Sequence, residues 1–371
     1  MELATRAVHA GRDDLVALGL HAVPLDLSTT YPARDTQAEA VRLETLATGE
    51  RIPGPPVYGR VGNPTVDRFE QALAQLEGCD DGVAFASGMA ALTACLLAVA
   101  AAGKPHVVAV RPLYGTTDHL LASGLLGTSV TWATPDTVRA ALRRDTGLVI
   151  VETPANPTLA TVDLRALADA CGDVPLLVDN TFATPVLQRP AESGATIVLH
   201  SATKFLGGHG DVLGGVVATT EDFARRLRQI RFATGAMLHP LAGYLLLRGL
   251  STLPVRMKAS SQTAATLATR LATHPAVSKV HYPGMGALVA FEVTGDPREV
   301  VAAVRLITPA VSLGSVDSLI QHPASLTHGV IDAESRADGG ISDRLLRLSV
   351  GLEDVDDLWT DLSKALAIIE G

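Results

Sequence analysis

The chain has 371 residues, of which 47% are hydrophobic and 19% are charged. This length predicts two or three domains, and this composition excludes a disordered or collagen-like chain. The formal net charge of −9 argues against a nucleic-acid partner, because phosphate binding needs a clustered basic surface. The three cysteines lie far apart and form no CxxC pair, which favours a reduced protein without a structural metal.

The N-terminal residues 1–14 contain no apolar segment of the signal-peptide type. The most apolar stretch, Met89–Ala102, is too short to cross a bilayer and is interpreted as a buried helix. We therefore expect a cytoplasmic protein with no membrane partner.

The predicted elements divide the chain into three parts. Residues 1–60 show few regular patterns and contain a Pro/Gly cluster at 52–56, so we expect an arm that contacts a neighbouring subunit. In residues 61–240 a helix at Val66–Leu76 is followed by short runs that are apolar on both faces, the pattern of a mainly parallel sheet covered by helices. These runs are Val83–Ala86, Val107–Val110, Val130–Trp132, Leu148–Val151, Leu176–Val178, Ile197–Leu199 and Val212–Ala218.

Residues 241–371 have a different texture. A long helical stretch, Leu241–His274, is broken near Thr252–Pro254 and gives way to alternating strands and helices. The prediction is an α/β protein with a large mainly parallel-sheet domain at 61–240 and a smaller α+β domain at 241–371.

Lys204 follows a predicted buried strand and lies among small hydroxyl and glycine residues. A lysine in such a place can act as a Schiff-base amine with a lowered pKa, and the alternative is a solvated turn lysine. Asp179 ends another apolar strand, where a buried acid needs a partner. If Asp179 faced a pyridinium nitrogen, with a lysine at the end of the next strand, the pair would suit pyridoxal phosphate (PLP) chemistry. The alternative is that Asp179 caps the N-terminus of the following helix.

Ser87-Gly88-Met89 lies at a predicted strand–helix junction, where backbone N–H groups can bind a phosphate or a serine can simply cap the helix. Ser201 and Thr203 add hydroxyls beside Lys204. His200 and His209 have no third ligand at metal spacing, so we expect no metal site.

The chain carries a series of ordered motifs: Tyr58–Thr65, Ser87–Ala91, Glu152–Pro157, Val178–Pro185, the segment around Lys204, Ser312–Gly314 and Arg347–Gly351. Together they resemble the Cys/Met-metabolism group of PLP enzymes, which includes cystathionine γ-synthases, cystathionine γ-lyases, methionine γ-lyases and homoserine sulfhydrylases. The resemblance covers nearly the whole chain. It implies the PLP-transferase fold of type I and a homotetramer built from two catalytic dimers.

The resemblance also implies roles for individual residues. Lys204 would carry PLP as a Schiff base and shuttle protons, Asp179 would pair with the pyridine nitrogen, and Tyr114 would stack on the ring and act as an acid–base group. Phosphate contacts are implied for Gly88, Met89, Ser201 and Thr203 of the same chain and for Tyr58 and Arg60 of the neighbouring subunit. Substrate contacts are implied for Arg347, which would clamp the α-carboxylate, and for Asn156, Ser312, Val57 and Val311.

The implied reaction is γ-elimination from cystathionine or a methionine-like amino acid, giving 2-oxobutanoate, ammonia and a thiol. Two alternatives stay open: γ-replacement of the cystathionine γ-synthase or O-acylhomoserine sulfhydrylase type, and a PLP-binding relative without turnover. Val57 and Val311 favour an apolar thioether, because cystathionine-cleaving relatives tend to be acidic at these places. Thr116 argues the other way, since methionine γ-lyases usually carry a cysteine there.

Overall fold

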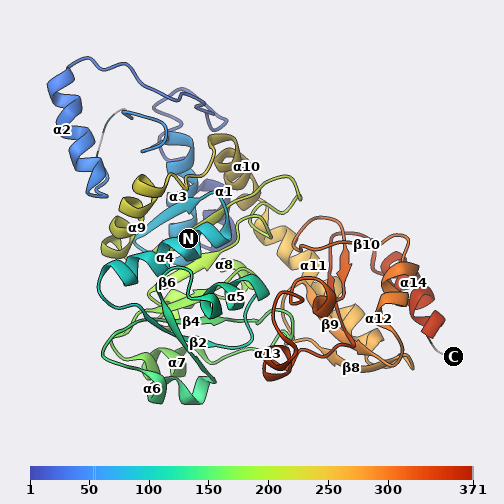
Figure 1. The fold of residues 1–371 in the computed structure, drawn as a ribbon. Coiled ribbons are helices and arrows are strands. Elements are labelled where there is room, and N and C mark those ends of the chain that lie inside the picture. Colours follow the sequence, from blue (N-terminus) through green and yellow to red (C-terminus); the bar gives the residue numbers. More distant parts are fainter. Residues whose placement is uncertain (53, 55, 370–371) are drawn as a thin grey trace.

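The structure is a computed structural model that describes residues 1–52, 54 and 56–369. Two residues of the predicted Pro/Gly cluster, 53 and 55, and the last two of the predicted C-terminal domain lie outside this description. Two sheets organise the chain, and Figure 1 shows the smaller one, orange to red, beside the larger.

The large sheet has seven strands in the order β1-β7-β6-β5-β4-β2-β3. They are β1 (Asp81–Phe85), β2 (His106–Val110), β3 (Ser129–Ala133), β4 (Thr146–Glu152), β5 (Leu176–Asp179), β6 (Ile197–His200) and β7 (Gly215–Thr219). All are parallel except β7, which runs antiparallel to β1 and β6. The mainly parallel sheet is therefore confirmed, although β7 begins after the first residues of the predicted run.

Helices cover both faces of this sheet, which explains why its strands are apolar throughout. One face packs against α4 (Gly88–Ala101), α5 (Gly115–Ser123) and α9 (Glu221–Thr234). The other packs against α3 (Pro64–Glu77) and α10 (Pro240–Leu250) at one end and α6 (Val138–Ala141) and α7 (Leu164–Cys171) at the other. The short α8 (Thr184–Leu187) follows β5.

The small sheet has five strands in the order β10-β11-β12-β9-β8. They are β8 (Val277–His281), β9 (Leu288–Val293), β10 (Thr308–Pro309), β11 (Leu319–Gln321) and β12 (Leu345–Ser349). Its apolar core is closed by α11 (Leu253–Leu271), α12 (Pro297–Ala303) and α14 (Val355–Leu366), while α13 (Ala333–Asp338) buries no residue. The α/β class is confirmed. The domain boundary at residue 240 stays a prediction, because α10 packs against α3 while α11 continues into the core of the small sheet.

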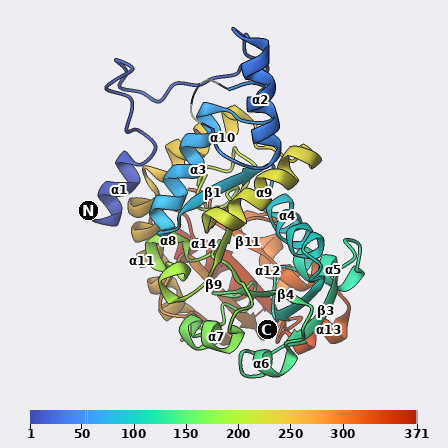
Figure 2. The same ribbon diagram turned by 90° about the vertical axis from the view of Figure 1, so that its left-hand side faces the viewer.

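The N-terminal part contains two helices that the sequence patterns did not predict, α1 (Leu3–His9) and α2 (Thr36–Ala47). Figure 2 shows α2 at the edge of the molecule, and no residue of α2 is buried within the chain. Asp35 caps α2 by accepting hydrogen bonds from the backbone N–H groups of Gln37 and Ala38. No helix within residues 1–52, 54 and 56–369 is long and apolar enough to span a membrane.

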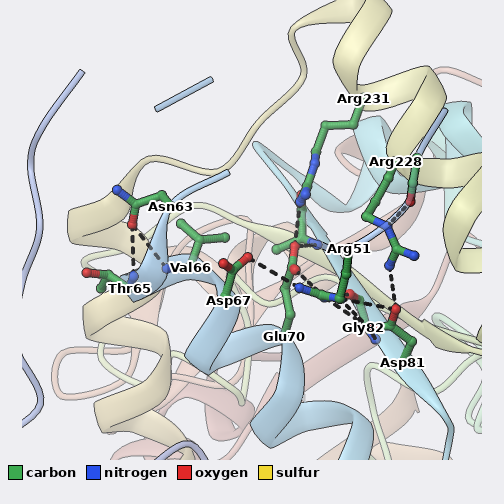
Figure 3. A network of polar contacts seen from close by, with 12 residues as sticks. Arg51, Asn63, Thr65, Val66, Asp67, Glu70, Asp81, Gly82, Arg228 and Arg231 are labelled. Carbon is green, nitrogen blue, oxygen red and sulfur yellow. Dashed lines mark hydrogen bonds and ion pairs between the residues drawn. The ribbon is translucent and has the colours of Figure 1, made fainter. Parts of the chain in front are cut away.

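A cluster of six charged side chains attaches the segment after α2 to the large sheet (Figure 3). We call it the Arg51 cluster; it comprises Arg51, Asp67, Glu70, Asp81, Arg228 and Arg231. Arg51 Nη2 lies 2.8 Å from Glu70 Oε2 and 2.9 Å from Asp81 Oδ1. From α9, Arg228 pairs with Asp81 and Arg231 with Glu70. Although burial alone would raise the pKa of Glu70, the charges of Arg231 and Arg51 lower it.

Replacing Glu70 by glutamine should destabilise the protein strongly. The Glu70 side chain is fully buried, so Glu70→Gln leaves two guanidinium groups short of a carboxylate. We expect a loss of about 3–5 kcal/mol in the free energy of unfolding, measured by urea denaturation. The control is Asp14→Asn, which breaks an ion pair with Arg68 in which Asp14 is 54% exposed and should cost less than about 1 kcal/mol. Equal losses in the two variants would contradict this account of the cluster.

Candidate active site

A cavity of about 400 Å³ lies where the carboxyl ends of β4, β5 and β6 meet residues from the small-sheet part of the chain. Eleven of the predicted site residues line it: Gly88, Met89, Tyr114, Asn156, Asp179, Ser201, Thr203, Lys204, Val311, Ser312 and Arg347. The carboxyl ends of parallel strands meet at one edge of a sheet, which brings these distant segments together.

Three predicted site residues lie away from this cavity within the single chain. Val57 lines a separate cavity of about 300 Å³ beside the Arg51 cluster. Tyr58 is 43% exposed, and Arg60 lies with its guanidinium carbon 5.5 Å from the Tyr58 ring centre. Arg60 also donates to the carbonyl of Phe232 at 2.7 Å. Their expected contact with a neighbouring subunit stays a prediction.

Lys204 lies in the cavity with its amine held by a neutral partner. Its Nζ donates to Ser312 Oγ at 2.7 Å. Burial lowers the pKa of Lys204 to about 8, and the charge of Arg347 acts in the same direction. A lysine in this environment exists largely as the free amine above pH about 8, well below the pH at which an ordinary lysine loses its proton, and the free amine is the form that attacks a carbonyl.

Asp179 presents a carboxylate to the cavity without an ion-pair partner in the described part of the chain. Its Oδ1 accepts two hydrogen bonds from Thr181, one from the backbone N–H at 3.0 Å and one from the hydroxyl at 2.5 Å. Burial raises the pKa of Asp179. The carboxylate therefore lacks a cation, and a protonated ring nitrogen in the cavity would supply one.

The N-terminus of α4 opens onto the same cavity. Ser87 caps this helix by accepting from the backbone N–H of Ala90 at 3.1 Å, and Gly88 and Met89 follow. A Cβ atom at Gly88 would lie 3.0 Å from the Ser201 Cβ, which is tighter than most real contacts, so Gly88 allows the two segments to pack closely. Backbone N–H groups at a helix N-terminus, the helix dipole and nearby hydroxyls are features that suit a phosphate group. The Thr203 hydroxyl donates a hydrogen bond to the Gly214 carbonyl and accepts one from the Gly214 N–H.

Arg347 lies on β12 and is only 2% exposed. Nη1 donates to Asn156 Oδ1 at 2.6 Å, and Nη2 donates to the Ser312 carbonyl at 2.9 Å. With its amide oxygen facing the guanidinium, Gln321 accepts from Nη2 at 2.6 Å. Burial lowers the pKa of Arg347 to about 10. All these partners are neutral, so the charge can accept a carboxylate from a ligand in the cavity.

Glu152 is a buried site residue to which the sequence patterns assigned no role. It ends β4, is 4% exposed, and accepts from the backbone N–H groups of Tyr114 at 2.7 Å and Asn156 at 3.1 Å. Burial and the nearby Asp179 charge raise its pKa well above the ordinary value. An acid at the end of an apolar strand was the signal that pointed to Asp179, and it would have found Glu152 as well.

Other cavity residues also escaped prediction. They include Thr117, Thr181, Phe182, Leu213 and Thr327, and it is Thr117 rather than its neighbour Thr116 that lines the wall. Within the described residues, no group of three or more His, Cys, Asp or Glu side chains could hold a metal ion.

A family model described as "Cys/Met metabolism PLP-dependent enzyme" matches residues 4–367. The chain belongs to this family. It is 71% identical over 366 residues to an L-methionine gamma-lyase of Streptomyces avermitilis. This alignment covers 98% of the chain and 89% of that protein. An L-methionine gamma-lyase of Brevibacterium sandarakinum is 54% identical, over 99% of this chain and 98% of that protein.

Solved structures of the same kind share the fold. A cystathionine gamma-lyase from Lactobacillus plantarum, complexed with L-serine, superposes with a TM-score of 0.90 at 34% identity and covers both chains fully. A cystathionine gamma synthase from Xanthomonas oryzae gives 0.90 at 36% identity, over 99% of this chain and 98% of that chain. These relatives confirm the predicted family, fold and PLP cofactor, and they confirm the predicted class, a PLP-dependent carbon–sulfur lyase.

The cavity fits PLP in three respects that come from this chain alone. The α4 N-terminus suits the phosphate, the unpaired Asp179 suits the ring nitrogen, and the free amine of Lys204 suits the aldehyde.

Capture of PLP by the apoprotein should depend on pH through Lys204. Because the amine reacts only when unprotonated, and its pKa is about 8 instead of 10.5, the rate of capture should rise up to pH about 8 and then level off. The measurement is the growth of visible Schiff-base absorbance after PLP is added. Lys204→Ala is the control and should show no such absorbance. A rate that keeps rising to pH about 10, or absorbance that survives in Lys204→Ala, would remove Lys204 from this role.

Proposed function

We propose that the chain is an L-methionine γ-lyase, which converts L-methionine and water to 2-oxobutanoate, ammonia and methanethiol. The observation that carries the proposal is the 71% identity to a protein of that name over 98% of the chain. The cavity adds a second argument. Its described lining carries two carboxylates, Glu152 and Asp179, and neither is available to the distal ammonium group of cystathionine. An unpaired ammonium there would be disfavoured, whereas a thioether methyl would not.

We assign the cofactor contacts as follows. Asp179 would hold the positive charge on the ring nitrogen, and Lys204 would carry the cofactor. Bound PLP supplies an electron sink for the charge that develops on Cα. The phosphate would lie among Gly88, Met89, Ser201 and Thr203, and Tyr58 and Arg60 would reach it from the neighbouring subunit.

The same proposal assigns the substrate contacts and the proton movements. Arg347 binds the α-carboxylate, supported by Asn156 and Ser312, and so fixes which bond to Cα breaks. The amine of Lys204 would remove the Cα proton. Loss of a Cβ proton would then leave an electron pair on Cβ that expels the sulfur from Cγ, and the Tyr114 hydroxyl would donate a proton to the departing sulfur. Val311 and, from the neighbouring subunit, Val57 provide apolar surface for the thioether.

We also propose a homotetramer of two catalytic dimers, in which residues 1–60 form the arm that contacts the neighbour, residues 61–240 the PLP-binding domain and residues 241–371 the second domain. The proposal is supported by exposed apolar side chains on this arm, such as Val41 at 55% and Leu27 at 58%. A cytoplasmic location is supported by the cysteines, all three of which are free.

The first test compares L-methionine, L-cystathionine and O-acetyl-L-homoserine as substrates of the PLP-loaded protein, with 2-oxobutanoate as the readout. We expect release from L-methionine at a kcat/KM at least tenfold above that for L-cystathionine, because the distal ammonium of cystathionine finds no available carboxylate in the described lining. A preference for L-cystathionine would replace the methionine assignment. Activity confined to the acyl ester would indicate a γ-synthase.

The second test removes the carboxylate clamp. Arg347→Ala should lower kcat/KM for L-methionine by about 30- to 5,000-fold, the equivalent of about 2–5 kcal/mol for truncating one partner of a buried charge pair. L-Methioninamide, which lacks the carboxylate, is the matched control substrate. The variant should lose far less of its kcat/KM for this compound. If Arg347→Ala lowers kcat/KM by the same factor for L-methionine and for L-methioninamide, Arg347 does not bind the carboxylate.

A further inference from the structure

We propose that His328 is a positioning residue for Tyr114, because it fixes the peptide group that presents the phenol to the substrate. The inference rests on the acid–base role assigned to Tyr114 above. His328 does not line the cavity, whereas Tyr114 and the adjacent Thr327 do, so His328 acts through its neighbours rather than on the substrate.

The peptide group between Leu113 and Tyr114 is held at both of its polar ends. Its N–H donates to Glu152 Oε2 at 2.7 Å, and its carbonyl oxygen lies 3.2 Å from His328 Nε2. The N–H and C=O of a trans peptide point in opposite directions, so Glu152 and His328 hold it from opposite sides. Fixing this plane fixes the direction in which the Tyr114 side chain leaves the backbone.

The hydrogen-bond partners of His328 define its tautomer. A backbone carbonyl only accepts, so Nε2 carries the hydrogen, and the Thr327 hydroxyl, 3.1 Å from Nδ1, serves as the donor there. His328 is fully buried, and burial lowers its pKa to about 4. The imidazole therefore stays neutral near neutral pH and has a single N–H, which donates to the Leu113 carbonyl, while the backbone of Asn156 also interacts with the ring.

The backbone around His328 touches the Tyr114 loop directly. A Cβ atom placed on Gly115 would lie 2.1 Å from the Thr327 carbonyl oxygen and 3.2 Å from the His328 Cα. Real atoms do not approach this closely, so a side chain at position 115 would push the two segments apart. Gly115 therefore allows the backbone at His328 to pack directly against the Tyr114 loop.

The same contacts connect Tyr114 to the carboxylate clamp. Glu152 Oε1 accepts from the Asn156 N–H at 3.1 Å, and Asn156 Oδ1 accepts from Arg347 at 2.6 Å. The guanidinium that would bind the substrate and the phenol that would protonate its sulfur are thus joined through one buried carboxylate. His328 holds the far end of this chain of contacts.

The test compares two replacements of His328. His328→Leu keeps most of the volume but removes the donor, and it should lower kcat at least tenfold with a change in KM below about threefold. His328→Gln retains a donor for the Leu113 carbonyl and should recover at least a third of the wild-type kcat. Failure of His328→Gln to exceed His328→Leu would overturn the proposal.

A double-mutant cycle with Tyr114→Phe separates positioning from general damage. If His328 acts through the Tyr114 hydroxyl, adding His328→Leu to Tyr114→Phe should cost less than twofold in kcat. If the double variant instead loses kcat by the product of the two single-variant factors, His328 does not act through Tyr114. The control is His322→Leu, since His322 is also buried and bonds a backbone carbonyl, that of Asp343 at 2.8 Å, in the same segment. It should lower the melting temperature and keep kcat.

The cycle uses whichever amino acid the wild-type chain turns over. A failure of the methionine assignment would then appear in the wild type alone, whereas a failure of the His328 inference would appear in the double variant.

Discussion

Arg347 is 2% exposed, and among the described residues its guanidinium donates hydrogen bonds to neutral oxygens alone. Desolvating a guanidinium costs several kcal/mol, so each of those oxygens has to be placed well. Asn156 supplies one from the loop after β4, and Ser312 supplies another from the segment before β11. Ser312 adopts a φ of +119°, a strained value for a residue with a side chain. The strain allows its carbonyl to meet Arg347 while its hydroxyl meets Lys204.

This arrangement divides the chemistry between the two sheets. The large sheet provides the groups suited to PLP at the ends of β5 and β6, where Asp179 and the Lys204 segment follow buried strands. The small sheet provides the guanidinium of Arg347 on β12, between β9 and β11. Because the substrate would need both at once, the packing between the two sheets would determine how its Cα is oriented.

Much of the fold could be predicted because parallel strands covered on both faces are apolar at every position. Each of the seven predicted runs overlaps one strand of the large sheet, with ends that differ by a few residues. α2 was missed because it buries no residue and so has no apolar stripe, and β10 is only two residues long. Strand-end polar residues pointed to Asp179. His328 gave no such signal, because its importance comes from a contact with Leu113, 215 positions away.

The Arg51 cluster balances three guanidinium groups against three carboxylates in one partly buried space. In such a closed set of charges, changing any one residue leaves an opposite charge uncompensated, whereas replacing a pair together by apolar residues can be neutral. Substitutions at these six positions are therefore expected to occur in pairs that keep the charges balanced. The segment that leads to Tyr58 and Arg60 is tied to this cluster through Arg51, so its attachment to the body of the protein should change more slowly in evolution than the exposed helix α2 that precedes it.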